Sequence, residues 1–248
     1  MAVTINGEGI TQEEYQQEIQ RYQDGLRKAG ATPPPDEEQK QQVLDELINQ
    51  LLLKQGAVEA GYTISAEEIQ SRLDQLAQQL GGQEALTAWQ KSNFYTGPIF
   101  RNAFERSIYA TWMRDKLTAE VPLTAEQVHV QQIRVLSESK AQGILAQLNS
   151  GTDFSDLAAQ YDRLTKGDLG WFPRGYLTQP AVEEAAFTQQ PGTYSGVIKT
   201  HVGYHIIKVL ELDAQHALTP DALKFMQQQA IQNWLAERKT SADINITP

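Results

Sequence analysis

The chain contains no cysteine among its 248 residues. This absence excludes disulfide bonds, thiolate catalysis and metal sites with cysteine ligands. Histidine is scarce too, with four scattered residues and no pair at a spacing typical of metal ligands on a helix. The composition therefore predicts no metal site and gives no sign of a cofactor.

Positive charge is in deficit. Lysine and arginine number 21 against 31 aspartates and glutamates, which leaves a net charge of -10 at pH 7. Nucleic acids and anionic membrane surfaces attract proteins with a basic patch. The charge balance thus argues against nucleic acid or a membrane surface as the partner.

Long apolar runs are missing as well. No stretch reaches the roughly 18 apolar residues that a membrane-spanning helix needs, so none is expected. The first residues show neither the basic region nor the apolar region of a signal peptide. Two interpretations remain: a cytoplasmic protein, or a mature envelope protein whose export or lipoprotein signal has been removed.

The first 120 residues are predicted to be mostly helical. Thr11 and Ser65 each begin a capping-box pattern, with a glutamate three residues later. Apolar residues recur at spacings of three and four between Val43 and Leu52, as on a buried helix stripe. The expected elements are a hairpin at 3–10 and helices at 11–28, 36–60, 65–80, 83–90 and 99–118.

The second half mixes strand and helix patterns. Residues 121–123 are expected to form a linker and 124–127 a single helical turn. The order β-α-α-α-β-β follows, with strands at 128–136, 197–199 and 204–210 and helices at 137–149, 155–161 and 182–187, and residues 167–170 as a turn. A last helix, at 220–238, has an apolar stripe that needs a partner, for which the first 120 residues are the obvious candidate.

Two motifs in this half are specific in combination. Gly-Asp-Leu-Gly-Trp-Phe occupies 167–172, and Gly-Tyr-His-Ile-Ile-Lys-Val occupies 203–209. With the element order, they resemble the C-terminal half of a parvulin-type peptidyl-prolyl isomerase domain. The flanking helices resemble, more loosely, those of SurA- and PrsA-type foldases of bacterial envelopes.

The resemblance implies an α+β chain of two domains. A mostly helical, chaperone-like domain would span 1–122 and be completed by the C-terminal helix at 214–248. A parvulin-like domain, with a small antiparallel sheet wrapped by helices, would span 123–213. Neither a metal nor a cofactor is implied, because rotation about a prolyl bond needs neither.

The resemblance also assigns a site. His205 matches the second of two family histidines, and Thr200 matches the pocket hydroxyl. Leu169 matches a pocket wall. Leu177 and Val182 stand where the family has a methionine or leucine and a phenylalanine, so Val182 implies a shallower slot.

Three features depart from the family pattern. Gln132 stands in place of the first family histidine, although its amide can still hydrogen-bond to the other. Arg134 places a charge where the family has an apolar residue. The loop after Tyr161 is short, with Asp162 as the only candidate for the family's Cys or Asp. His129 is an odd number of residues from Gln132 and is expected on the opposite strand face.

Two functions follow from this mixed pattern. The first is peptidyl-prolyl isomerisation of unfolded or extended client polypeptides that contain proline, at reduced activity. The second is a non-catalytic chaperone whose degenerate parvulin domain binds peptide or braces the helical domain. The retained residues favour the first function and the departures favour the second.

Overall fold

The computed structural model describes residues 1–247, which divide into two compact units. Of the described residues, the first unit comprises 1–120 and 229–247, and the second comprises 121–228. Each is an α+β structure with antiparallel strand pairing, as the sequence predicts. None of the described helices has an apolar stretch long enough to cross a membrane.

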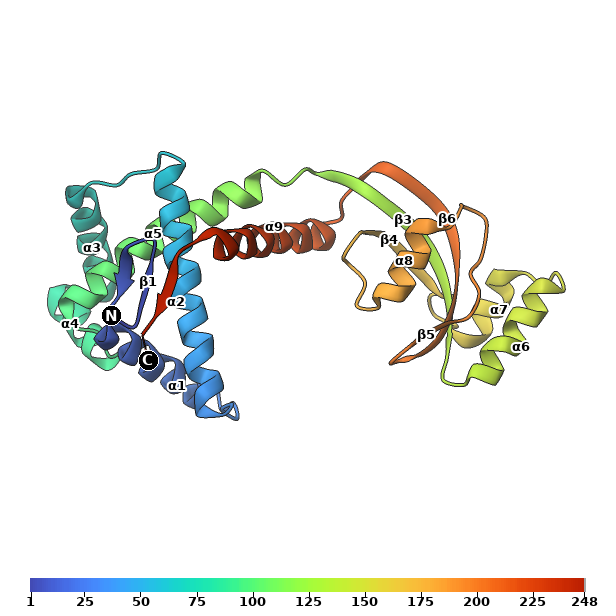
Figure 1. Cartoon of the computed structure of the whole chain (residues 1–248), viewed down its shortest axis with the longest axis horizontal. Helices are drawn as coiled ribbons and strands as arrows, with labels where there is room; N and C mark the ends of the chain where they lie inside the picture. Colours follow the sequence, from blue (N-terminus) through green and yellow to red (C-terminus); the bar gives the residue numbers. More distant parts are fainter. Residues whose placement is uncertain (248) are drawn as a thin grey trace. The chain divides into compact units, whose positions relative to one another are not determined.

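The first unit is built from long helices around a small sheet (Figure 1). The sheet has the order β2-β1-β7, so the last strand of the chain pairs with the first. Its elements are β1 (Val3–Ile5), β2 (Glu8–Ile10), α1 (Gln12–Lys28), α2 (Asp36–Glu59), α3 (Ala66–Leu80), α4 (Gln83–Ser92), α5 (Gly97–Ala119), the second half of α9 (Pro220–Ser241) and β7 (Ile244–Ile246).

Local capping begins the helices where the sequence predicts. The hydroxyl oxygens of Thr11 and Ser65 accept hydrogen bonds from the backbone N–H groups of Glu14 and Glu68. Each bond satisfies one of the donors that a helix leaves unpaired in its first turn. The predicted stripe of α2 lies in the core, where Leu47, Leu51 and Leu52 are almost fully buried.

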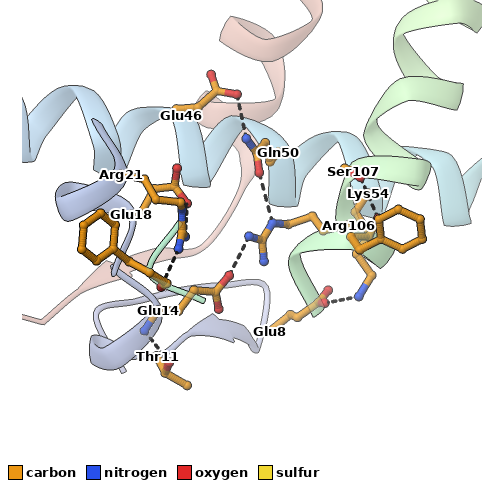
Figure 2. A network of polar contacts seen from close by, with 12 residues as sticks. Glu8, Thr11, Glu14, Glu18, Arg21, Glu46, Gln50, Lys54, Arg106 and Ser107 are labelled. Carbon is orange, nitrogen blue, oxygen red and sulfur yellow. Dashed lines mark hydrogen bonds and ion pairs between the residues drawn. The ribbon is translucent and has the colours of Figure 1, made fainter. Parts of the chain in front are cut away.

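Buried charges connect three helices of this unit (Figure 2). Glu14 of α1 and Arg106 of α5 form an ion pair with both side chains buried. Gln50 of α2 accepts a hydrogen bond from Arg106 and donates one to Glu46. A buried charge is tolerated only when it is paired, so this contact fixes which faces of α1, α2 and α5 meet.

The end of α9 packs into the first unit. Trp234 lies over Gly56 of α2, where a Cβ atom would come within 2.5 Å of the indole ring. The helix runs to Ser241 rather than Arg238, and β7 follows it, paired with β1. The sequence did not predict β7, since three residues near the chain end carry little strand signal of their own.

The second unit is a four-stranded antiparallel sheet in the order β4-β3-β6-β5. Its strands are β3 (Thr124–Val135), β4 (Asp168–Pro173), β5 (Ile198–Thr200) and β6 (Gly203–Ala217), and its helices are α6 (Glu138–Asn149), α7 (Phe154–Tyr161), α8 (Pro180–Thr188) and the first half of α9. Helices α6 and α7 cover one face and α8 covers the other (Figure 1).

Two predicted details of this unit are wrong. Residues 124–127 are not a helical turn but the start of β3, paired with the end of β6. The buried amide of Gln127 donates to the carbonyl oxygens of His216 and Ala217, a long-range contact that local sequence does not reveal. The motif at 167–172 is also more than a turn, because β4 begins at Asp168 and buries Phe172 against β3.

The division between the units falls inside α9, whereas the expected boundary lies between residues 213 and 214. The first turns of α9 belong with the second unit because Ala222 is buried and Phe225 packs edge-on against Tyr176, 5.2 Å between ring centroids. The remainder of the helix carries the apolar side chains that enter the first unit.

Candidate functional site

An apolar slot lies over one face of the second unit's sheet. A cavity of about 280 Å³ is bounded by Leu169, Leu177, Val182 and Val202, with Gln132, Arg134, Thr178, Gln179 and His205 completing its lining. The structure thus brings together side chains from β3, β4, α8 and β6 that are far apart in the sequence. The slot has the size and character to accept a small apolar ring.

The slot wall at Leu177 is held by backbone hydrogen bonds. Glu183, in the first turn of α8, accepts from the N–H groups of Gly175 at 2.7 Å and Leu177 at 2.9 Å. The carboxylate therefore ties the loop after β4 to the helix that supplies Val182. Val182 itself is almost fully buried and forms the base of this wall.

Three polar side chains form a continuous row at the site. His205 is buried on β6, with Nδ1 2.8 Å from Oε1 of Gln132 and Nε2 2.8 Å from Oγ1 of Thr200. An amide oxygen can only accept, so Nδ1 carries the imidazole proton and Nε2 accepts from the threonine hydroxyl. Gln132 thereby fixes the tautomer of the neutral ring, and both ring nitrogens are engaged.

The surroundings of His205 favour its neutral form. Burial lowers the pKa of the imidazole, and the positive charge of Arg134 lowers it further. Arg134 stands directly opposite His205 in the pairing of β3 with β6. The row is therefore uncharged at neutral pH.

A second, more polar cavity adjoins the slot. It measures about 240 Å³ and shares Gln132, Arg134 and Leu169 with the slot. Its other lining residues are Tyr161, Asp162, Thr165 and Gly167. Because the three shared residues border both spaces, an extended peptide could occupy the two cavities with consecutive residues.

Asp162 lines this polar cavity, and its hydrogen bonds go to its own loop rather than to His205 or Gln132. Its carboxylate accepts from the Thr165 hydroxyl and from the N–H groups of Thr165 and Leu164. These hydrogen bonds hold the pKa of Asp162 below its usual value. Both carboxylate oxygens of Asp162 thus accept hydrogen bonds within the short loop after α7.

His129 lies outside both cavities. Its Nε2 is 2.8 Å from Oδ1 of Asp168, and its ring packs against Trp171 at 5.5 Å between centroids. A bulge separates His129 from Val130 in the pairing with β6. His129 thus lies apart from the row of Gln132, His205 and Thr200.

Sequence reasoning missed part of the site. Val202, Tyr161 and Thr165 line the cavities, although no motif pointed to them. For Val202 a local pattern was available, a threonine followed three residues later by a glycine, Thr200 and Gly203. In the turn between them, the N–H of Val202 donates to Oγ1 of Thr200. No group of three or more potential metal-ligating side chains is gathered anywhere in residues 1–247.

Comparison with known families assigns both halves of the chain. Residues 115–213 match the PPIC-type PPIase domain, and residues 1–106 match the SurA-like N-terminal domain. These two ranges include every site residue described above and the helices of the first unit up to the middle of α5.

Curated relatives cover most of the chain. The foldase protein PrsA of Caldanaerobacter subterraneus subsp. tengcongensis is 28% identical over 238 residues, covering 84% of this chain and 72% of the relative. A parvulin-like PPIase of Rickettsia bellii is 28% identical over 225 residues, covering 86% and 74%. Chaperone SurA of Nitrosococcus oceani is 26% identical over 250 residues, covering 85% and 58%.

A solved structure is similar along the same length. The crystal structure of the peptidylprolyl isomerase PrsA from Bacillus cereus is 25% identical, covers 84% of this chain and 84% of its own, and superposes with a TM-score of 0.51.

Proposed function

The chain belongs to the parvulin-type peptidyl-prolyl isomerases that carry a SurA-like N-terminal domain, and we propose that its slot isomerises prolyl bonds in extended client polypeptides. The observation that carries this proposal is the row of Gln132, His205 and Thr200 beside a slot of about 280 Å³ with apolar walls. Catalytic and binding roles for individual residues are part of the proposal.

Catalysis of prolyl isomerisation requires few chemical groups. Rotation about the X–Pro bond has a barrier of about 18–20 kcal/mol because resonance holds the amide planar. Twisting breaks that resonance, which leaves a ketone-like carbonyl and an amine-like nitrogen with a lone pair. A site accelerates the rotation when it fits the twisted form better than the planar one. No nucleophile, metal or proton transfer is needed.

The site residues divide this work. Leu169, Leu177 and Val182 would hold the proline ring in an apolar, water-poor slot. His205 would act through its shape and dipole, since both of its nitrogens are already hydrogen-bonded. Thr200 would keep the ring oriented.

Gln132 would be the residue nearest the rotating bond. Its Oε1 is engaged by His205, its Nε2 makes no hydrogen bond with the described residues, and the residue borders both cavities. An amide N–H there can donate to the prolyl nitrogen as its lone pair develops, which stabilises the twisted form. Gln132 would thus replace a histidine without losing a donor.

The departures from the family pattern predict a rate below that of parvulins with two histidines and an aromatic slot wall. Exchange spectroscopy on a proline-containing tetrapeptide measures this rate without a coupling protease. His205→Ala and Leu169→Ala should lower it about tenfold or more, since each removes a contact specific to the twisted state. Leu212→Ala, a half-exposed leucine of β6 outside both cavities, is the control. A wild-type rate equal to that in buffer would refute the isomerase proposal.

A second function rests on the separate helical unit. The non-catalytic alternative is a chaperone that holds clients while the parvulin domain only binds peptide or braces the helices. Suppression of a client's aggregation by the full chain distinguishes the two. If Leu169→Ala and His205→Ala leave suppression intact while abolishing isomerisation, holding and isomerisation are separate; if the wild type shows suppression alone, the chaperone function stands by itself.

We also propose a location in the bacterial cell envelope, which the resemblance to SurA- and PrsA-type foldases supports. Cell fractionation of the native host tests this proposal. Recovery in the cytoplasmic fraction would favour the alternative.

A further inference from the structure

Arg134 is the charged side chain at the junction of the two cavities. It lies on β3, two residues from Gln132 on the same strand face, and directly opposite His205 in the strand pairing. It borders both the apolar slot and the polar cavity. Its side chain is exposed, so a bound peptide can reach it.

The guanidinium of Arg134 has no partner within the described part of the chain. No ion pair or hydrogen bond involves it there, whereas Arg174 of the same unit pairs with Glu126 at 3.0 Å. The carboxylate of Asp162, which lines the polar cavity, accepts hydrogen bonds from Thr165 and from the loop backbone. Five N–H donors and a full positive charge thus face the site unused in a chain of net charge -10.

We propose that Arg134 is a specificity-determining residue that selects clients with an acidic side chain immediately before the proline. This inference rests on the proposed isomerase function and names its preferred substrate class. The recognition would be a charge-assisted hydrogen bond from the guanidinium to a glutamate or aspartate carboxylate.

The order of the cavities determines which residue Arg134 meets. The proline ring occupies the apolar slot, so the rotating bond lies over the residues that the two cavities share, Gln132 among them. The residue on the other side of that bond is the one that precedes proline. It enters the polar cavity beside Arg134, where a carboxylate finds donors and an apolar side chain finds few partners.

The competing explanation is that Arg134 binds the peptide backbone. A guanidinium that donates to a client carbonyl oxygen would aid every substrate equally and give no preference for acidic residues. The two explanations differ in how the effect of an Arg134 substitution depends on the residue before proline.

The experiment uses the full chain and three peptides, Ala-Glu-Pro-Phe, Ala-Gln-Pro-Phe and Ala-Lys-Pro-Phe, with capped ends. Exchange spectroscopy gives kcat/KM and an NMR titration gives Kd for each. We expect the wild type to prefer Glu over its isostere Gln by about fivefold, as for one solvent-accessible ion pair. The preference should shrink as salt is added, because exposed charges are screened.

Two substitutions test the residue. Arg134→Leu should remove the Glu preference, so kcat/KM should fall about fivefold more for the Glu peptide than for the Gln peptide, and Arg134→Glu should reverse the preference in favour of Lys by a similar factor. Arg163→Leu is the matched control, since it removes the same charge from an exposed residue of the neighbouring loop that lines neither cavity. The urea midpoint of each variant checks that the fold is retained.

The outcomes separate the two proposals. Equal losses for all three peptides in Arg134→Leu would overturn the inference in favour of backbone binding, with the isomerase function intact. A shift of preference in Arg163→Leu as large as in Arg134→Leu would overturn it in favour of a general field effect. If no peptide is isomerised, the proposed function fails, and the Kd values for Glu, Gln and Lys still decide whether Arg134 selects acidic peptides.

Discussion

Glu14→Gln should destabilise the first unit far more than an equivalent surface change. Oε1 of Glu14 lies 2.6 Å from Nη2 of Arg106, and each side chain is only 6% exposed (Figure 2). The substitution keeps the size and one acceptor of the carboxylate but removes its charge. It leaves the guanidinium of Arg106 buried with neutral acceptors alone, the introduced amide and Gln50.

The expected magnitude follows from burial. Breaking a buried ion pair by removing one partner costs about 3–5 kcal/mol. Because the glutamine oxygen can still accept one hydrogen bond, we expect the lower end, about 3 kcal/mol. A loss of that size is a large share of a typical unfolding free energy of about 5–15 kcal/mol. It should lower the Tm of this unit by about 6–12 °C.

The chain offers a matched control in the same unit. Nη2 of Arg72 and Oε1 of Glu68 are 2.7 Å apart, but their side chains are 43% and 51% exposed. Glu68→Gln should therefore cost under about 1 kcal/mol. Urea unfolding followed by circular dichroism gives both values. Losses that agree within about 0.5 kcal/mol would refute the argument that burial sets the cost.

Two further predictions concern the site. Burial and the charge of Arg134 lower the pKa of His205, so the folded chain binds a proton on this imidazole less readily than the unfolded chain does. The free energy of unfolding should therefore fall as the pH drops below about 6.5. His205→Gln should make this fall with pH less steep in urea titrations. Between pH 8 and 6.5 the isomerisation rate should stay flat. Gly167→Ala should disturb the site, since a Cβ would lie 2.1 Å from the carbonyl oxygen of Gln132. Gly170→Ala shares the positive φ but meets no atom within 4 Å, so equal effects on rate would contradict this reason.

The helices could be predicted because their signals are local. The caps at Thr11 and Ser65 and the stripe of α2 depend on residues within one or two turns. The pairing of β7 with β1 depends instead on residues about as far apart as the chain allows, with Ile5 opposite Ile244. No local pattern records such a contact.

Motifs pointed to several residues of the candidate site, and the lining residues that sequence reasoning missed lie outside those motifs. Leu169, Thr200 and His205 lie within the two specific motifs or next to them. Tyr161 and Thr165 enter the polar cavity through the conformation of a short loop, which depends on how Asp162 bonds to its backbone. That bonding follows from the folded loop and has no spacing signal in the sequence.

Gln132 and Arg134 both act on the same imidazole, that of His205, and their chemistry is compatible there. Arg134 faces His205 across the strands, and Gln132 is hydrogen-bonded to the same imidazole. A histidine at 132 would put two titratable rings beside a fixed positive charge. Protonation of either ring would then cost Coulomb energy, offset in part by Asp162 across the polar cavity. An amide supplies the acceptor that His205 requires without that liability.

Gln132→His tests this reasoning. At pH 8 both rings are neutral, and a ring nitrogen of the new histidine can accept from Nδ1 of His205, so the rate should stay within about threefold of wild type. As the pH falls from 8, one added proton, shared by the two rings, should disrupt the row, so the rate of the variant should fall at a higher pH than that of the wild type. An unchanged urea midpoint at pH 8 serves as the control for folding. Superimposable pH profiles for the two proteins would show that the neutral amide is not what protects the site, and the pairing of Gln132 with Arg134 would lose its electrostatic explanation.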